Sequence, residues 1–85
     1  MPNYKSFKAT LEEDYNFPTR YIFKFIVKTG SKEKILELLP DAKKSERVSK
    51  NGNYVSVTLS QIMKKSEEIV YIYEKAYKIK GVISL

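Results

Sequence analysis

The sequence contains no cysteine, no histidine and no tryptophan, and it has only three glycines and three prolines. Without cysteine, the chain can form no disulfide and no thiolate metal site. It also lacks the commonest general base of enzymes and their strongest common nucleophile. We therefore expect a protein that is not an enzyme and that holds no metal and no cofactor.

Long apolar runs are missing as well. The sequence contains no run of about 18 apolar residues, the length needed to cross a bilayer. It also has no apolar segment after a basic start at the N-terminus. Together with the lack of cysteine, this pattern predicts a cytoplasmic protein without membrane contact.

The composition that remains is that of one small folded domain. The 85 residues are 42% hydrophobic and 31% charged, and 16 basic against ten acidic residues give a net charge of +6. A basic domain can bind nucleic acid, anionic lipid or an acidic protein. Lysine-rich surfaces also serve solubility, so the charge alone does not choose between these roles.

Alternation predicts the strands. From Thr19 to Lys28 one face is apolar throughout, and the other alternates between isoleucine and lysine. Further strands are predicted at 43–50, 53–60 and 82–85, with a hairpin turn at Asn51-Gly52. The inward side chains of the two long strands are Tyr21, Phe23, Phe25, Val27, Val55, Val57 and Leu59.

Helical spacing predicts three helices. Tyr4, Phe7 and Leu11 mark a short helix within residues 1–16. A second helix follows Ser31 as N-cap and ends near Leu39, before Pro40. A third begins at Ser66 as its cap and ends at Gly81. Its apolar stripe comprises Ile69, Ile72, Tyr73, Ala76 and Ile79.

The order β-α-β-β-α-β predicts an α+β fold of the ferredoxin-like class. The four-stranded antiparallel sheet has strand order 4-1-3-2, with two helices on one face. We expect a domain over residues 17–85, preceded by a helical extension over residues 1–16.

Three segments resemble a known family. "FPTRYIFKFIV", "SKNGNYVSVTL" and "YIYEKAYKIKGVISL" are together similar to the YbeD-like family of small bacterial proteins of unknown function. The resemblance implies a ferredoxin-like fold, similar in architecture to ACT-type regulatory domains, and it suggests regulation or ligand sensing. It implies no catalytic residue.

The segment "SKNGNYVSVTL" also has features of an RNA-recognition strand. Such strands present two or three exposed rings for base stacking. Here only Tyr54 points outward, Ser56 follows where a second ring would stand, and the first strand offers no outward ring. The pattern favours an ordinary hairpin.

Three candidate surfaces remain. A polyanion surface along the second strand and hairpin would comprise Lys43, Lys44, Arg47, Lys50 and Tyr54; the alternative is a charged, solvated edge strand. A partner surface on the open sheet face would comprise Ile22, Lys24, Ile26 and Val82, unless the N-terminal helix covers it. An anion loop would comprise Lys28, Gly30, Ser31 and Lys32; the alternative is a plain turn.

Two further features complete the expectations. The uncharged fourth strand leaves an edge open to pairing. On the third helix, Tyr73 and Tyr77 should border the core, and Tyr71 should be exposed. We expect a regulatory or interaction domain that contacts a protein partner, a second copy or a small ligand. The alternative is sequence-tolerant binding of RNA or another polyanion.

Overall fold

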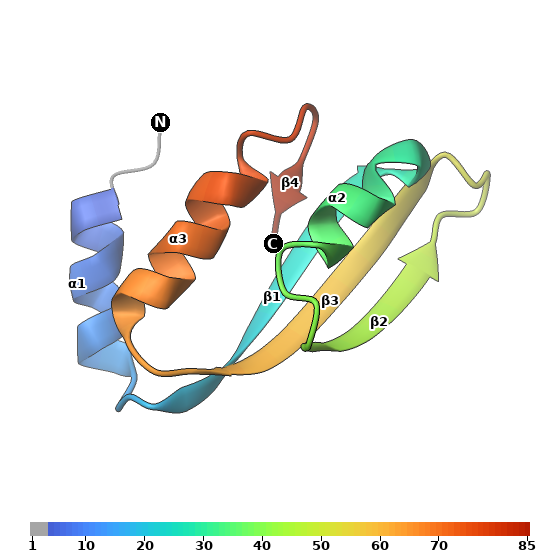
Figure 1. The fold of residues 1–85 in the computed structure, drawn as a ribbon. Coiled ribbons are helices and arrows are strands. Elements are labelled where there is room, and N and C mark those ends of the chain that lie inside the picture. Colours follow the sequence, from blue (N-terminus) through green and yellow to red (C-terminus); the bar gives the residue numbers. More distant parts are fainter. Residues whose placement is uncertain (1–3) are drawn as a thin grey trace.

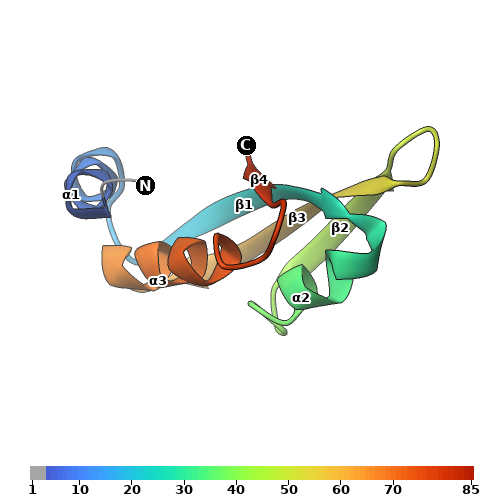
Figure 2. The same ribbon diagram turned by 90° about the horizontal axis from the view of Figure 1, so that it is seen from above.

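The computed structural model describes residues 4–85, and in this range the chain forms an α+β fold with three α-helices and one open antiparallel sheet of four strands. The elements are α1 (Tyr4–Asp14), β1 (Thr19–Lys28), α2 (Lys32–Leu36), β2 (Lys43–Val48), β3 (Tyr54–Met63), α3 (Ser66–Ala76) and β4 (Ile83–Ser84). After α1 they follow the predicted order. Figures 1 and 2 show α2 and α3 on the same side of the sheet.

The sheet order is β2-β3-β1-β4, which is the predicted order 4-1-3-2 read from the opposite edge. The central strands β1 and β3 pair along their whole length, from Thr19 opposite Met63 to Lys28 opposite Tyr54. β4 is shorter than predicted and pairs only with Phe25 and Ile26. β3 is longer than predicted, because Gln61, Ile62 and Met63 continue the pairing with the start of β1.

The core lies between the sheet and the two helices on its covered face. The predicted inward residues Phe23, Phe25, Val27, Val55, Val57 and Leu59 are all fully buried. Ile35 of α2 and Ile69, Ile72, Tyr73 and Ala76 of α3 pack against them. Alternation along the strands therefore predicted the buried face correctly, since successive side chains point to opposite faces.

The helix α1 packs beside α3, on the side away from α2 (Figure 1). Leu11 is 3% exposed, and the rings of Phe7 and Tyr73 meet edge to face with centroids 5.3 Å apart. Ser66 Oγ donates a hydrogen bond to Glu12 Oε2 at 2.8 Å. Because these contacts hold α1 against α3, it does not cover the open face of the sheet, where Ile22 stays 57% exposed.

Of the two predicted helix caps, the position of Ser31 is confirmed and that of Ser66 is wrong. Ser31 is the N-cap residue of α2 at the end of a short 3₁₀ turn, Thr29–Ser31, although its side chain makes no capping bond. Ser66 is the first residue of α3 instead of its cap, and its buried hydroxyl binds Glu12. At this helix start the Glu68 carboxylate accepts the Lys64 backbone N–H at 2.7 Å. The hydroxyl of Ser66 thus helps to hold α1 against α3, and a contact between distant segments of this kind cannot be inferred from local sequence.

Both predicted helix ends were too late. α2 ends at Leu36, because the Leu38 N–H turns back to the Ile35 carbonyl at 3.1 Å and Leu39 precedes a proline. α3 ends at Ala76, and the chain continues in tighter turns until Gly81, which has a φ of 77°. Lys78 and Lys80 therefore lie beyond the helix.

A hairpin joins β2 and β3 as predicted, but its turn is centred on Lys50 and Asn51 and not on Asn51-Gly52. Gly52 has a positive φ of 78° whereas Asn51 does not, so the two-residue Asn-Gly turn does not form. β2 ends at Val48 and not at Lys50, because Ser49 already belongs to the turn. The Ser49 carbonyl accepts the Gly52 N–H at 2.9 Å, and the Ser49 hydroxyl accepts the Tyr54 N–H at 3.0 Å. Thr29 fastens the turn to β1 by donating its hydroxyl to the Gly52 carbonyl at 2.6 Å.

Candidate functional site

The face of the sheet away from α2 and α3 is left uncovered by the helices of the fold (Figures 1 and 2). We call it the open face and define it from strand register and alternation. It comprises Arg20, Ile22, Lys24, Ile26 and Lys28 of β1, Tyr54, Ser56, Thr58, Ser60 and Ile62 of β3, Lys43, Ser45 and Arg47 of β2, and Ile83 of β4. Arg20 lies across this face, donating from Nη1 to Ser60 Oγ at 3.0 Å.

The open face carries nearly all of the excess positive charge. It has five basic side chains, Arg20, Lys24, Lys28, Lys43 and Arg47, and no carboxylate among the described residues. The other 11 basic residues nearly balance the ten acidic ones, so five of the six net charges lie here. The acidic residues lie on the helices, in turns and on the covered side of β2: Glu12, Glu13, Asp14, Glu33, Glu37, Asp41, Glu46, Glu67, Glu68 and Glu74.

Apolar side chains are interleaved with these cations. Ile22 is 57%, Ile62 49% and Ile83 53% exposed. Ile83 stands opposite Ile26, and Ile62 stands opposite Arg20. A hollow of about 340 Å³ lies among Ile26, Arg47, Lys50 and Tyr54 at the hairpin end. The face thus offers both apolar contact and attraction for negative charge.

The predicted polyanion surface is not a single surface. Lys43, Arg47 and Tyr54 belong to the open face, but Lys44 stands opposite Leu59 on the covered side and donates to the Pro40 carbonyl. Lys50 lies in the hairpin turn. Because neighbouring residues of a strand point to opposite faces, adjacent lysines could not act together. Reading β1 and β2 by alternate residues would have found Arg20 and Lys28 instead.

The residues of the predicted partner surface and of the predicted anion loop also lie on different parts of the structure. Ile22, Lys24 and Ile26 lie on the open face as predicted. Val82 instead packs partly against the core, and Ile83 occupies the place on the open face that was predicted for Val82. In the predicted anion loop, Lys28 faces the open side opposite Tyr54. Lys32 instead pairs with Glu46 at 3.1 Å across the covered side. Gly30 and Ser31 lie in the 3₁₀ turn between them, so the loop does not bring its two lysines together.

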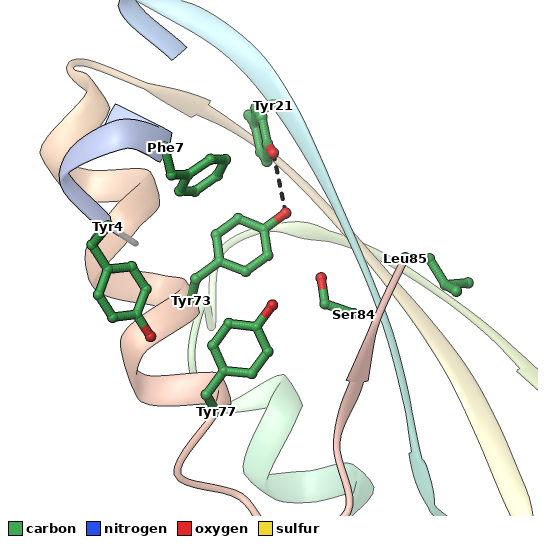
Figure 3. A pocket seen from close by; sticks show the side chains of 7 residues that line it. All are labelled: Tyr4, Phe7, Tyr21, Tyr73, Tyr77, Ser84 and Leu85. Carbon is green, nitrogen blue, oxygen red and sulfur yellow. Dashed lines mark hydrogen bonds between the residues drawn. The ribbon is translucent and has the colours of Figure 1, made fainter. Parts of the chain in front are cut away.

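A second feature is an aromatic cleft of about 380 Å³ between α1, α3 and β4 (Figure 3). Its lining side chains are uncharged: Tyr4 and Phe7 of α1, Tyr21 of β1, Tyr73 within α3, Tyr77 just after it, and Ser84 and Leu85 at β4. The hydroxyls of Tyr21 and Tyr73 share a hydrogen bond of 3.1 Å. Tyr73 belongs to the buried core, whereas Tyr77 is 43% exposed and stacks on the Tyr73 ring. Tyr71 is exposed as predicted. The cleft itself was missed, since it needs three distant segments.

Burial raises the pKa of the Tyr21 hydroxyl, and its hydrogen bond to Tyr73 raises it further. Burial also raises the pKa of Tyr73, although the hydrogen bonds with Tyr21 and Ser84 act in the opposite direction. Both phenols therefore stay neutral to a higher pH than a tyrosine in an unfolded chain, which ionises at about pH 10.

These shifts predict an alkaline loss of stability. A group whose pKa is higher in the folded state contributes fully below its unfolded pKa and loses that contribution as pH rises above it. We expect the free energy of unfolding, measured with urea, to fall above about pH 10. The fall should be shallower in Tyr21→Phe than in the exposed control Tyr71→Phe. Equal slopes in the two variants would show that Tyr21 is not responsible.

Fold and site together define a small α+β domain with one bare, basic face. No helix within residues 4–85 has the length and apolar character needed to cross a membrane. The chain belongs to the family described as "Protein of unknown function (DUF493)", whose model matches residues 12–85. Comparisons with curated proteins and with solved structures found no match.

Proposed function

We propose that the protein is a small interaction domain that binds an acidic protein partner with its open face. One observation carries this proposal: the open face holds five cations and no carboxylate among the described residues, interleaved with isoleucines that are about half exposed. Complementary charge guides a partner onto such a face and selects against wrong partners. The isoleucines supply apolar area that a protein surface can bury.

Nucleic acid is the second candidate, favoured by the same five cations. A phosphate backbone could run from Lys43 along β2 to Arg47 and then to Lys28 at the hairpin end, beside the exposed ring of Tyr54. Single-stranded binding normally adds stacking worth about 1–3 kcal/mol per base on several rings. The open face offers one ring and four isoleucines, and this composition favours a protein.

The finer assignments belong to the same proposal. We propose a ferredoxin-like architecture, a YbeD-like family relationship and a bacterial origin. A regulatory role would follow from likeness to ACT-type domains, although shared fold alone does not carry function. We also propose that the protein works in the cytoplasm and is not an enzyme, since the chain has neither histidine nor cysteine.

A site-specific photo-cross-linker tests the proposal. Placed in cells at position 62, on the open face, it should join the chain to a protein. At position 71, which is similarly exposed on α3, it should give no such adduct. Reversing the open-face charges with Lys24→Glu and Lys43→Glu should remove the adduct at position 62.

Enzymatic digestion of the adduct decides between the candidates. A protease-sensitive adduct supports the acidic protein partner. A nuclease-sensitive adduct overturns that partner in favour of nucleic acid. Equal adducts at positions 62 and 71, or none at position 62, overturn the open face as the binding surface.

A further inference from the structure

The outer edge of β1 is only partly paired. β4 pairs with Phe25 and Ile26, and the Leu85 N–H donates to the Lys24 carbonyl at 2.9 Å. Antiparallel strands direct the backbone groups of alternate residues to alternate sides. Ile22 and Arg20 therefore present their N–H and C=O groups to the same edge as Lys24. Within residues 4–85, no strand pairs with β1 at these two residues along this edge.

The aromatic cleft adjoins this edge on the covered side of the sheet. Tyr21 lies on β1 between Arg20 and Ile22 and faces the cleft, while Ser84 and Leu85 border it from β4. Figure 3 shows Tyr73 and Phe7 grouped near Tyr21, with Tyr77 turned toward Ser84. A side chain that leaves the edge toward the covered side would enter this cleft.

The opposite side of the same edge is basic. Arg20, Ile22 and Lys24 point to the open face, and Ile22 is 57% exposed. A side chain that leaves the edge toward the open face would therefore lie beside two cations. The two sides of one edge thus call for different residues in alternation, apolar on one side and acidic on the other.

We propose that an extended segment of the partner protein adds to β1 at Arg20–Ile22 as an antiparallel strand in line with β4. Its glutamates or aspartates lie opposite Arg20 and Ile22 on the open face, beside Lys24, and its intervening apolar side chains enter the aromatic cleft. This assignment rests on the proposed function and names the chemistry of the partner: a strand that alternates acidic with apolar or aromatic residues. Main-chain hydrogen bonds supply affinity in such strand addition, and the alternate side chains supply specificity.

A capped heptapeptide that alternates glutamate and valine, with phenylalanine as its central residue, tests the proposal. Added to the isotopically labelled protein, it should produce saturable NMR shifts concentrated at residues 19–25 and slow the exchange of the Ile22 amide. In the proposed pairing, the glutamate N–H groups face β1. Methylating those amides should abolish binding, and methylating the valine and phenylalanine amides should leave it unchanged.

Matched protein variants test the two sides of the edge. Tyr77→Ala removes a side chain that lines the cleft and should weaken binding of the peptide. Tyr71→Ala should leave binding unchanged, although both tyrosines are exposed. Lys24→Glu should weaken it by about fivefold, the scale of one exposed ion pair, whereas Lys34→Glu on α2 should have no effect.

The outcomes separate this inference from the proposed function. Absent shifts at residues 19–25, or equal affinity for the two methylated peptides, overturn strand addition. A protein adduct at position 62 would then still support the open face. Peptide binding without any adduct at position 62 would support strand addition at the edge of β1 and would overturn the rest of the open face as a binding surface.

Discussion

Replacing Phe23 with alanine is expected to leave the protein largely unfolded at room temperature. Phe23 is fully buried, and the centroid of its ring lies 4.8 Å from that of Tyr21 and 5.3 Å from that of Tyr73. Truncating a buried phenylalanine costs about 3–5 kcal/mol. A core of this size supplies a net stability of only about 3–5 kcal/mol, so this one cavity removes most or all of it.

The neighbouring residue provides the control. Ile22→Ala changes the same strand one position away, but the side chain lies on the open face and is 57% exposed. Its free energy of unfolding should change by less than about 1 kcal/mol. Urea unfolding followed by circular dichroism measures both variants. Similar losses in the two would contradict the assignment of covered and open faces.

Leu11→Ala is expected to release α1 from the rest of the domain. Leu11 is the one residue of α1 that is buried among residues 4–14, and truncating a buried leucine costs about 2–5 kcal/mol. The contacts that remain include the partly buried Tyr4 and Phe7, the Ser66–Glu12 hydrogen bond and the exposed ion pair of Lys8 with Glu67. Exposed ion pairs contribute little, about 0–1 kcal/mol each.

Amide hydrogen exchange measures this release. The amides of α1 should lose protection while those of β1 and β3 keep theirs, and Thr10→Ala, an exposed change in the same helix, should leave both unchanged. This result would support the prediction that residues 1–16 are an extension of a domain at 17–85. Loss of protection throughout the sheet would instead make α1 part of a single cooperative unit.

The central strands were the most predictable part of the fold. β1 has the bounds that its alternation predicts, Thr19–Lys28, because ten residues of uniform period leave little freedom of register. Helix starts and ends were less predictable. The sequence suggests Ser66 as a cap, but the fold uses its hydroxyl to hold α1. Such tertiary uses leave no local pattern.

The sequence was enough to predict that the open face combines basic and apolar side chains, but not which residues belong to it. The isoleucines and Lys24 of β1 were found from alternation within one strand. The basic set required the register of β2 on β3, which turns Lys43 and Arg47 to the open face and Lys44 away from it. The aromatic cleft joins α1, α3 and β4, and no spacing along the chain relates residues so far apart.

The uneven distribution of charge described above gives the molecule an electric dipole moment. Its positive end is the open face, and the carboxylates lie toward the helices. An anionic partner would experience a torque during approach, so that encounters begin already oriented toward β1 and β3. At physiological ionic strength, salt screens the attraction between charges that are more than about 8–10 Å apart. The rate of encounter should therefore depend on salt more strongly than the lifetime of the complex does.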